Sequence, residues 1–316
     1  MMAKNNHASL RRSSSHWSRL VRGGVIRFGF YFLLCALSFV FLYPFIKMIT
    51  QSLMTDDDLI NITVKWLPSQ LTWSNYAVAY RKLMFKSYVW NSARVAIICT
   101  LGHVLSCAMT GYAFARYKFR FKGALFAMVI LTMLVPVQTV IPQYMQFSNW
   151  GWLNSEYYLP LVVPSFLGFG LNGAFFIFLF RQFFSGMPYE MEEAARVDGC
   201  GPIRTFLHIM LPMSQSSLLV CTMLSIVWHW NDYFEPGVYF NSVWLKMLPN
   251  SLPNLYAELN KEQHTMIQTN DIEGIIFNEA MLMAATFLCI LPILILYLIL
   301  QKRFMEGVER SGLTGI

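Results

Sequence analysis

Six apolar runs of about 20 to 25 residues are the feature that most constrains what this chain can fold into. A helix of that length, at about 1.5 Å rise per residue, crosses a hydrocarbon core of about 30 Å. Backbone polar groups in lipid must be paired internally, so we expect each run to be a transmembrane helix. The runs cover about residues 28–50, 91–115, 123–147, 157–180, 209–233 and 279–300.

The composition supports this interpretation. Apolar and aromatic residues make up 56% of the 316 residues, and charged residues only 13%. Soluble domains carry about 25% charged residues, so this chain has too few to solvate the surface of a soluble protein of its length. We therefore expect an all-α polytopic membrane protein with about six transmembrane helices.

The distribution of basic residues predicts the orientation of these helices. Residues 1–27 hold six Lys or Arg and no acid, and Lys302 and Arg303 follow the last run. Basic residues flanking spans mark the cytoplasmic side, so both termini are expected there, as a disordered tail over 1–27 and a second tail over 304–316. The net charge of +7 then reflects membrane topology, and no nucleic-acid partner is expected. Four more basic residues follow the second run: Arg116, Lys118, Arg120 and Lys122.

The loop over 186–208, between the fourth and fifth runs, is the most distinctive segment. Pro188 suits the first turn of a helix, because proline lacks the N–H that a first turn leaves unpaired. Gly199 stands where a left-handed residue would end that helix, and Gly201-Pro202 would break the chain and restart it. We expect a short helix over about 188–198, a sharp turn and a second helix. Its first turn is acidic, with Glu190, Glu192 and Glu193 near the positive end of the helix dipole.

One face of this helix is expected to be small and largely apolar. Met191, Ala194, Ala195 and Asp198 recur at the spacing that shares a helix face. The two alanines would let another surface approach closely.

Fixed spacings connect this loop to the fifth run. Glu193-Ala194-Ala195 is followed after three residues by Gly199, and after nine more by Ile209, then Leu211-Pro212. This pattern resembles the EAA motif, the cytoplasmic coupling loop of ABC importer permeases. The resemblance implies that the loop docks into a cleft on a separate ATPase subunit, with Glu193 meeting a basic group there. The coupling residues it implies are Glu192, Glu193, Ala194, Ala195, Asp198, Gly199, Ile209, Leu211 and Pro212.

Two further matches lie inside the apolar runs. Pro136 to Tyr144 resembles the proline-kinked third span of this family, and Trp230-Asn231-Asp232 resembles its W-N-D sequence. A role in lining the translocation path and a role in ordinary helix packing or an interfacial aromatic belt both fit these residues. The candidate path residues are Gln138, Gln143, Trp230, Asn231 and Asp232.

Together the matches are similar to the second permease subunit of carbohydrate-uptake importers, as in maltose and glycerol-phosphate systems. The resemblance implies a type I importer permease domain over 28–303, in the inner membrane of a bacterium, with an outer loop over 234–278. It also implies three partners: a second, related permease, an ATPase dimer and an extracytoplasmic sugar-binding protein.

No catalytic or metal site is expected in this chain. A phosphate-binding loop needs a Gly-Lys pair, and the sequence has none. ATP hydrolysis, with its ATP and Mg²⁺, is therefore assigned to the partner, and this chain is expected to bind no cofactor.

Two other classes of protein remain as alternatives. An ion-coupled secondary transporter of a small polar solute would need a buried chain of acids and bases, and usually an internal repeat; neither is evident. A membrane enzyme would need catalytic residues converging at one membrane face, but His208 and Asp232 fall at opposite ends of the fifth run.

Overall fold

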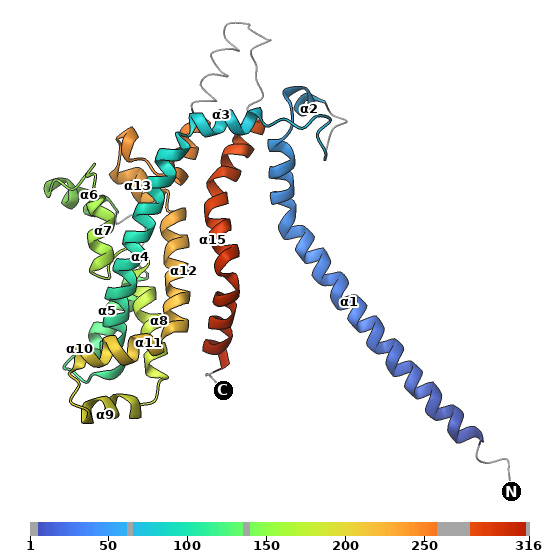
Figure 1. Ribbon diagram of the computed structural model, residues 1–316, viewed down its shortest axis with the longest axis horizontal. Coiled ribbons are helices and arrows are strands. Elements are labelled where there is room, and N and C mark those ends of the chain that lie inside the picture. Colours follow the sequence, from blue (N-terminus) through green and yellow to red (C-terminus); the bar gives the residue numbers. More distant parts are fainter. Residues whose placement is uncertain (1–5, 62–65, 135–139, 258–278, 314–316) are drawn as a thin grey trace, which may run out of the picture. The chain divides into compact units, whose positions relative to one another are not determined.

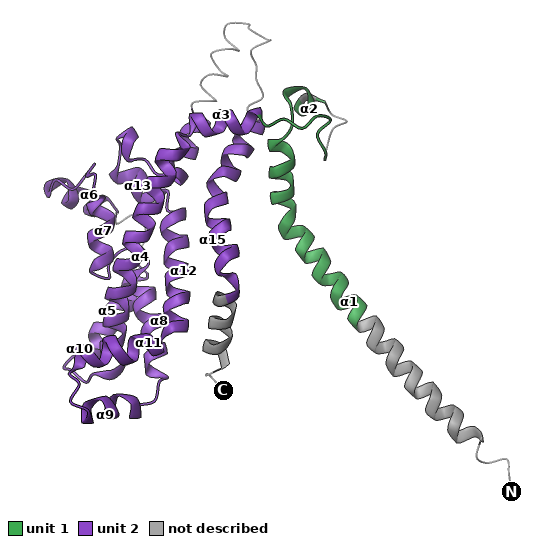
Figure 2. Cartoon of the chain, viewed as in Figure 1, with its two compact units in different colours: residues 1–73 green, residues 74–316 purple. Residues whose placement is uncertain are grey.

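The computed structural model describes residues 6–61, 66–134, 140–257 and 279–313, and every regular element in these ranges is a helix (Figure 1). The chain divides into two compact units, Met1–Trp73 and Ser74–Ile316 (Figure 2). Each is described on its own.

The first unit is dominated by one long helix, α1 (Asn6–Ser52). Its apolar part, Arg27–Ser52, leaves nearly all of its side chains exposed, as expected for a helix that is hydrophobic all round and faces lipid or other helices. Because α1 begins at Asn6, the prediction of a disordered tail over 1–27 is wrong for residues 6–27, which are helical. The short α2 (Asp56–Ile60) follows, capped by Thr55, whose side chain accepts a hydrogen bond from the Asp58 N–H.

The second unit is organised around α4 (Phe85–Arg116). This helix contacts α8 (Gly173–Ser185), α12 (Gln215–Asn231) and α7 (Leu159–Phe166). On its other side α12 contacts α15 (Glu279–Leu313), which also packs on α3 (Ser74–Lys82). The closest approach is at Gly111, where an added Cβ would lie 2.6 Å from Cβ of Phe180. The missing side chain lets the α4 and α8 backbones touch, as small residues do between membrane helices.

The third and fourth predicted spans are not continuous helices. The third is divided between α5 (Lys122–Thr132) and α6 (Val140–Asn149), while Gln138 lies outside the described residues. In the fourth, α7 ends at Phe166 and α8 begins only at Gly173. An added Cβ at Gly173 would lie 2.2 Å from the Gly168 carbonyl oxygen, and Gly168 itself has φ +77°. Glycine thus permits a tight turn between α7 and α8, which the apolar run concealed.

The fifth predicted span is bent near its start. Residues 202–213 form α10 (Pro202–Thr205), a π-helical turn η2 (Phe206–Met210) and α11 (Leu211–Met213). This segment meets α12 at 82°, so Ile209, Leu211 and Pro212 precede the bend rather than beginning the span. Proline has no N–H for the regular helical ladder. At the bend, the Ser214 N–H donates to the Met210 and Leu211 carbonyls over 3.0 and 3.1 Å, and the Ser214 hydroxyl also donates to the Leu211 carbonyl over 2.7 Å.

Among the described residues, three helices are long and apolar enough to cross a membrane, Arg27–Ser52, Phe85–Arg116 and Glu279–Lys302. The bent pair 202–213 and α12 would make a fourth, while α5 and α8 are shorter apolar helices. The expected all-helical architecture is confirmed in the described ranges. The expected count of about six spans stays a prediction.

The loops of the second unit gather at two ends. At the end opposite α9 (Glu190–Val197), Asn91 at the start of α4 donates to the Trp244 and Lys246 carbonyls over 2.9 and 3.0 Å. The Tyr158 hydroxyl donates to the Leu245 carbonyl there. The short helices α13 (Phe234–Tyr239) and η3 (Val243–Leu245) belong to this end. At the α9 end, Arg116 contacts the 186–208 loop. The 116–122 and 186–208 loops therefore lie at the same end of this unit.

Candidate functional site

The loop between α8 and η2 contains the expected short helix, α9 (Glu190–Val197). Three carboxylates occupy its first turn and Arg196 its last turn, which complements the helix dipole at both ends. Pro188 lies two residues before the helix rather than in its first turn. Tyr189 starts the helix instead, and its carbonyl accepts from the Glu192 and Glu193 N–H groups over 3.0 and 3.2 Å.

The end of α9 is the predicted glycine turn. Gly199 has φ +79°, its N–H donates to the Arg196 carbonyl over 3.1 Å, and the Cys200 N–H donates to the Ala195 carbonyl over 2.9 Å. This pair of bonds is a Schellman motif, which needs a left-handed residue at the position of Gly199. The next helix begins at Pro202, directly after Gly201, so the predicted break and restart is confirmed.

The two alanines of α9 lie on different faces. Ala195 is buried together with Glu192, whereas Ala194 is exposed. The predicted common face of Met191, Ala194, Ala195 and Asp198 is therefore wrong for Ala195, because neighbouring residues are turned by about 100° around a helix. The small Ala195 side chain lets α9 approach its own bundle, and Ala194 leaves the opposite face open.

The open face of α9 is partly apolar. Besides Ala194 it carries Glu190, Glu193 and Val197, and the Val197 side chain is 87% exposed. Another exposed apolar side chain in the helix is Met191, and beyond the helix Tyr189, Ile203 and Leu207 are exposed too. Clustered exposed apolar residues rimmed by charges are typical of a protein interaction site. We call Glu190, Glu193, Ala194 and Val197 the outer face of α9.

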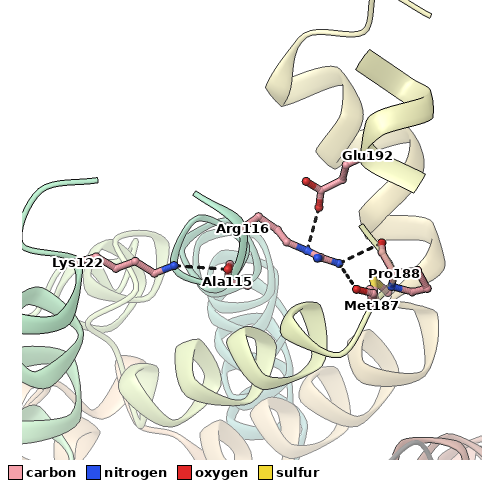
Figure 3. Close-up of polar contacts among 6 residues, drawn as sticks. All are labelled: Ala115, Arg116, Lys122, Met187, Pro188 and Glu192. Atoms are coloured by element: carbon pink, nitrogen blue, oxygen red, sulfur yellow. Dashed lines mark hydrogen bonds and ion pairs between the residues drawn. The ribbon is translucent and has the colours of Figure 1, made fainter. Parts of the chain in front are cut away.

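The inner face of α9 is tied to the last residue of α4 (Figure 3). Arg116 Nε lies 2.9 Å from Glu192 Oε1, and the two side chains are 1% and 10% exposed. Arg116 Nη2 also donates to the Met187 carbonyl over 2.6 Å and to the Pro188 carbonyl over 3.4 Å. The guanidinium covers the Tyr189 ring at 4.2 Å from its centroid. One arginine thus contacts every part of the segment that enters α9.

The electrostatics of Glu192 reflect this setting. Burial raises the pKa of the Glu192 carboxyl, and the nearby Arg116 and Arg196 charges offset part of that rise. A buried carboxylate is costly unless it is paired. The ion pair with Arg116 therefore keeps a charge in a place that would otherwise favour the protonated acid.

An aromatic cluster holds both ends of the loop against α4. The Tyr112 ring lies 5.4 Å from that of Phe184, in the last turn of α8, and 5.1 Å from that of Phe206, the first residue of η2. Ile209 and Leu211 are half-buried against the same apolar cluster, while Pro212 is exposed. These two coupling-loop residues thus anchor the loop to the bundle rather than facing outward.

Sequence reasoning missed the role of Arg116. It assigned Arg116 to topology and Glu192 to contact with an ATPase, whereas the structure joins the two side chains inside the protein. The signal available was position: Arg116 directly ends the second apolar run, so its side chain could turn back onto the bundle. The next two basic residues, Lys118 and Arg120, are exposed.

The described candidate path residues make contacts at the loop end of the bundle opposite α9. Trp230 is 5% exposed, and its indole N–H donates to the Cys289 carbonyl of α15 over 3.2 Å. Asp232 accepts from the Phe234 and Glu235 N–H groups at the start of α13. These contacts are structural; Gln143, which accepts from the Tyr239 hydroxyl, and the exposed Asn231 are likewise at the loop end. Their role in a path stays a prediction.

Within the described ranges, no three His, Cys, Asp or Glu side chains converge where they could hold a metal ion.

Comparisons with known proteins cover most of the chain. A family model described as binding-protein-dependent transport system inner membrane component matches residues 107–310. A probable ABC transporter permease protein of Pyrococcus horikoshii is 30% identical, over 86% of this chain and 92% of that protein. The arabinooligosaccharides transport system permease protein of Halalkalibacterium halodurans is 26% identical, over 88% and 93%.

A third relative and a solved structure agree with these. The sn-glycerol-3-phosphate transport system permease protein of Yersinia enterocolitica is 26% identical, over 85% of this chain and 91% of that protein. The fold matches a chain in the crystal structure of a bacterial ABC transporter involved in alginate import, with a TM-score of 0.70 and 22% identity. That match covers 91% of this chain and 98% of the other.

Proposed function

This chain belongs to the family of binding-protein-dependent transport system inner membrane components, and we propose that it is a permease subunit of an ATP-driven sugar importer. The observation that carries the proposal is the outer face of α9. A short helix that ends a bundle with Ala194 and Val197 exposed is suited to insertion into a cleft on another protein.

The protein that carries this cleft is inferred from a motif that this chain lacks. The sequence has no phosphate-binding loop, so the energy of ATP, with its Mg²⁺, is supplied by a separate ATPase dimer. Ala194 permits close packing against it, and the exposed Glu193 meets a basic group. Closure of the ATPase dimer on ATP then displaces α9 as a rigid lever.

The remaining partners are proposed from the family and from the two ends of the bundle. A second, related permease completes the translocation path beside this one. The end formed by residues 234–257 and the start of α4 faces outward, towards an extracytoplasmic sugar-binding protein. The α9 end and both termini face the cytoplasm of a bacterial cell. The printed substrates of the relatives, arabinooligosaccharides and glycerol phosphate, favour a polyhydroxylated solute.

A photocrosslinking residue at Ala194 tests the docking. In membranes from cells that carry the whole transport system, illumination should join this chain to a polypeptide that contains a P-loop, identified by mass spectrometry. The same residue at Trp244, which is 71% exposed at the other end, should give no such product.

The alternative is an ion-coupled transporter that needs no ATPase. An Ala194 probe that never captures a P-loop protein, in membranes whose solute uptake persists without ATP and stops when an ionophore collapses the ion gradient, would overturn the proposal.

A further inference from the structure

We propose that Arg116 and Glu192 form an internal latch that makes α9 and α4 move as one body. The inference rests on the proposed function, because it concerns how displacement of α9 reaches the membrane helices. The latch transmits the displacement of α9 to α4, which is distant from the loop in sequence. The helices α8 and η2, which adjoin the loop in sequence, receive it as well.

The contacts of Arg116 are those of a clamp rather than of a surface charge. Its side chain is 1% exposed and binds the Glu192 carboxylate and two backbone carbonyls (Figure 3). It also covers the Tyr189 ring. An arginine with several simultaneous partners in fixed directions restrains rotation as well as distance. Exposed ion pairs do not do this.

The chain immediately around α9 is a poor transmitter by itself. After the helix come the left-handed turn at Gly199 and the restart at Pro202, and the following segment meets α12 at 82°. Turns and bends of this kind can absorb a displacement by changing a few backbone angles. A direct connection from α9 into a long straight helix avoids these joints.

Two features make the end of α4 a suitable receiver. Tyr112, one turn before Arg116, packs on Phe184 and Phe206, which lie on either side of the loop. At the preceding residue, Gly111, the backbones of α4 and α8 are in close contact with no side chain between them. Tightly packed helices transmit displacement because their interface cannot deform continuously.

The test measures a distance along the proposed rigid body. One spin label is placed at Trp90→Cys, an exposed position early in α4, and the other at Met191→Cys, an exposed position within α9. The exposed Cys35 and the half-buried Cys200 are changed to Ser, while Cys99, Cys107, Cys221 and Cys289 are buried. The complex is purified with its co-expressed partners, without nucleotide and after trapping with ATP and vanadate, and retained nucleotide confirms the trapping.

In the otherwise unchanged complex, the distance between the two labels should differ by less than about 2 Å between the states. The latch is removed by Arg116→Met together with Glu192→Met, which leaves no unpaired buried charge. This double variant should keep its ATPase subunits, yet its label distance should broaden or shift by more than about 2 Å on trapping. Arg120→Met, at an exposed arginine in the same loop, is the matched control and should behave as the unchanged complex.

Two distance results would overturn the latch: a change of more than about 2 Å in the unchanged complex, or a double variant whose label distances equal those of the unchanged complex. Loss of the ATPase from the double variant would also overturn it, because the ion pair would then serve docking itself. If the unchanged complex carries no co-purifying ATP hydrolysis, the proposed function fails first and the latch with it. ATP hydrolysis is therefore measured before any label distance.

Discussion

At the scale of single residues, the Arg116–Glu192 pair has the largest expected consequences. Exchanging a buried ion pair for apolar side chains is often tolerated, whereas removing one partner leaves an uncompensated charge and costs about 3–5 kcal/mol. Replacing Arg116 or Glu192 alone should therefore lower the free energy of unfolding strongly, whereas replacing both with methionine should lower it much less.

Arg116→Met should destabilise the protein in a pH-dependent way. Burial holds the pKa of Glu192 above its usual value, and loss of Arg116 removes a charge that opposes this. An acid whose pKa is raised in the folded state favours folding below that pKa, and this contribution is lost as the pH rises through it. This contribution is fully present only below the unfolded-state pKa of about 4.3. The melting temperature in detergent should thus fall further below that of the unchanged protein at about pH 7 than at about pH 4.

Glu192→Gln in the Arg116→Met background is the control. It removes the titrating group, so the deficit relative to the unchanged protein should become independent of pH. A deficit in Arg116→Met alone that does not change with pH would show that Glu192 is not left as an unpaired buried acid.

Gly199→Val should weaken the turn after α9. The backbone there has φ +79°, and a left-handed conformation costs an L-residue about 1–2 kcal/mol, more for a β-branched side chain. An added Cβ meets nothing within 4 Å at either Gly199 or Gly201, so Gly201→Val, at φ −73°, is a matched control for bulk.

The measurement is ATP hydrolysis that co-purifies with the tagged chain. Gly199→Val should lose it while still inserting into the membrane, and Gly199→Asn, which tolerates the left-handed region, should retain most of it. Equal loss of ATP hydrolysis from Gly199→Val and Gly201→Val would show that the left-handed turn at Gly199 is not the cause.

The residue scale also shows what sequence can reveal. Gly199 and Gly201-Pro202 were predictable, because a left-handed turn and a helix restart have local residue preferences. The Arg116 contact was not, since Arg116 and Glu192 are distant in sequence and meet only through the packing of α4 against the loop.

At the scale of elements, the closeness of α4 and α8 depends on Gly111. An added Cβ there would lie 2.6 Å from Cβ of Phe180 and 2.9 Å from the Arg181 nitrogen. Gly111→Ala should therefore force the two helices apart and lower the free energy of unfolding by about 1–3 kcal/mol.

The check is thermal unfolding in detergent, with Gly123→Ala as the control. Gly123 is in α5, and an added Cβ there meets nothing within 4 Å, so this variant should be neutral or slightly stabilised by its better helix propensity. Equal melting temperatures for the two alanine variants would contradict the close helix contact.

The sequence predicts that these elements are helices, but it does not predict where the helices are interrupted. Hydropathy locates apolar runs, and all of them contain helices. It does not show that the fourth run is interrupted between Phe166 and Gly173, because that depends on backbone conformations at Gly168 and Asn172. The three glycines in that run, Gly168, Gly170 and Gly173, were the available signal.

At the scale of the whole molecule, the two ends of the bundle should face opposite sides of the membrane. A membrane-impermeant maleimide should label Lys118→Cys in inverted vesicles and Trp244→Cys in right-side-out vesicles. Both positions are exposed, and Cys35 and Cys200 are changed to Ser beforehand. Labelling of both positions from one side would contradict the orientation.

Docking of an ATPase on the outer face of α9 is the claim on which the account depends, and bulk on that face tests it most directly. Ala194→Trp is compared with Ala257→Trp, an exposed alanine at the opposite end of the bundle, in complexes purified through a tag on this chain. Ala194→Trp should lose the co-purifying P-loop subunit and its ATP hydrolysis by about tenfold or more, and Ala257→Trp should keep both. Full retention of that subunit and its activity by Ala194→Trp would contradict the account.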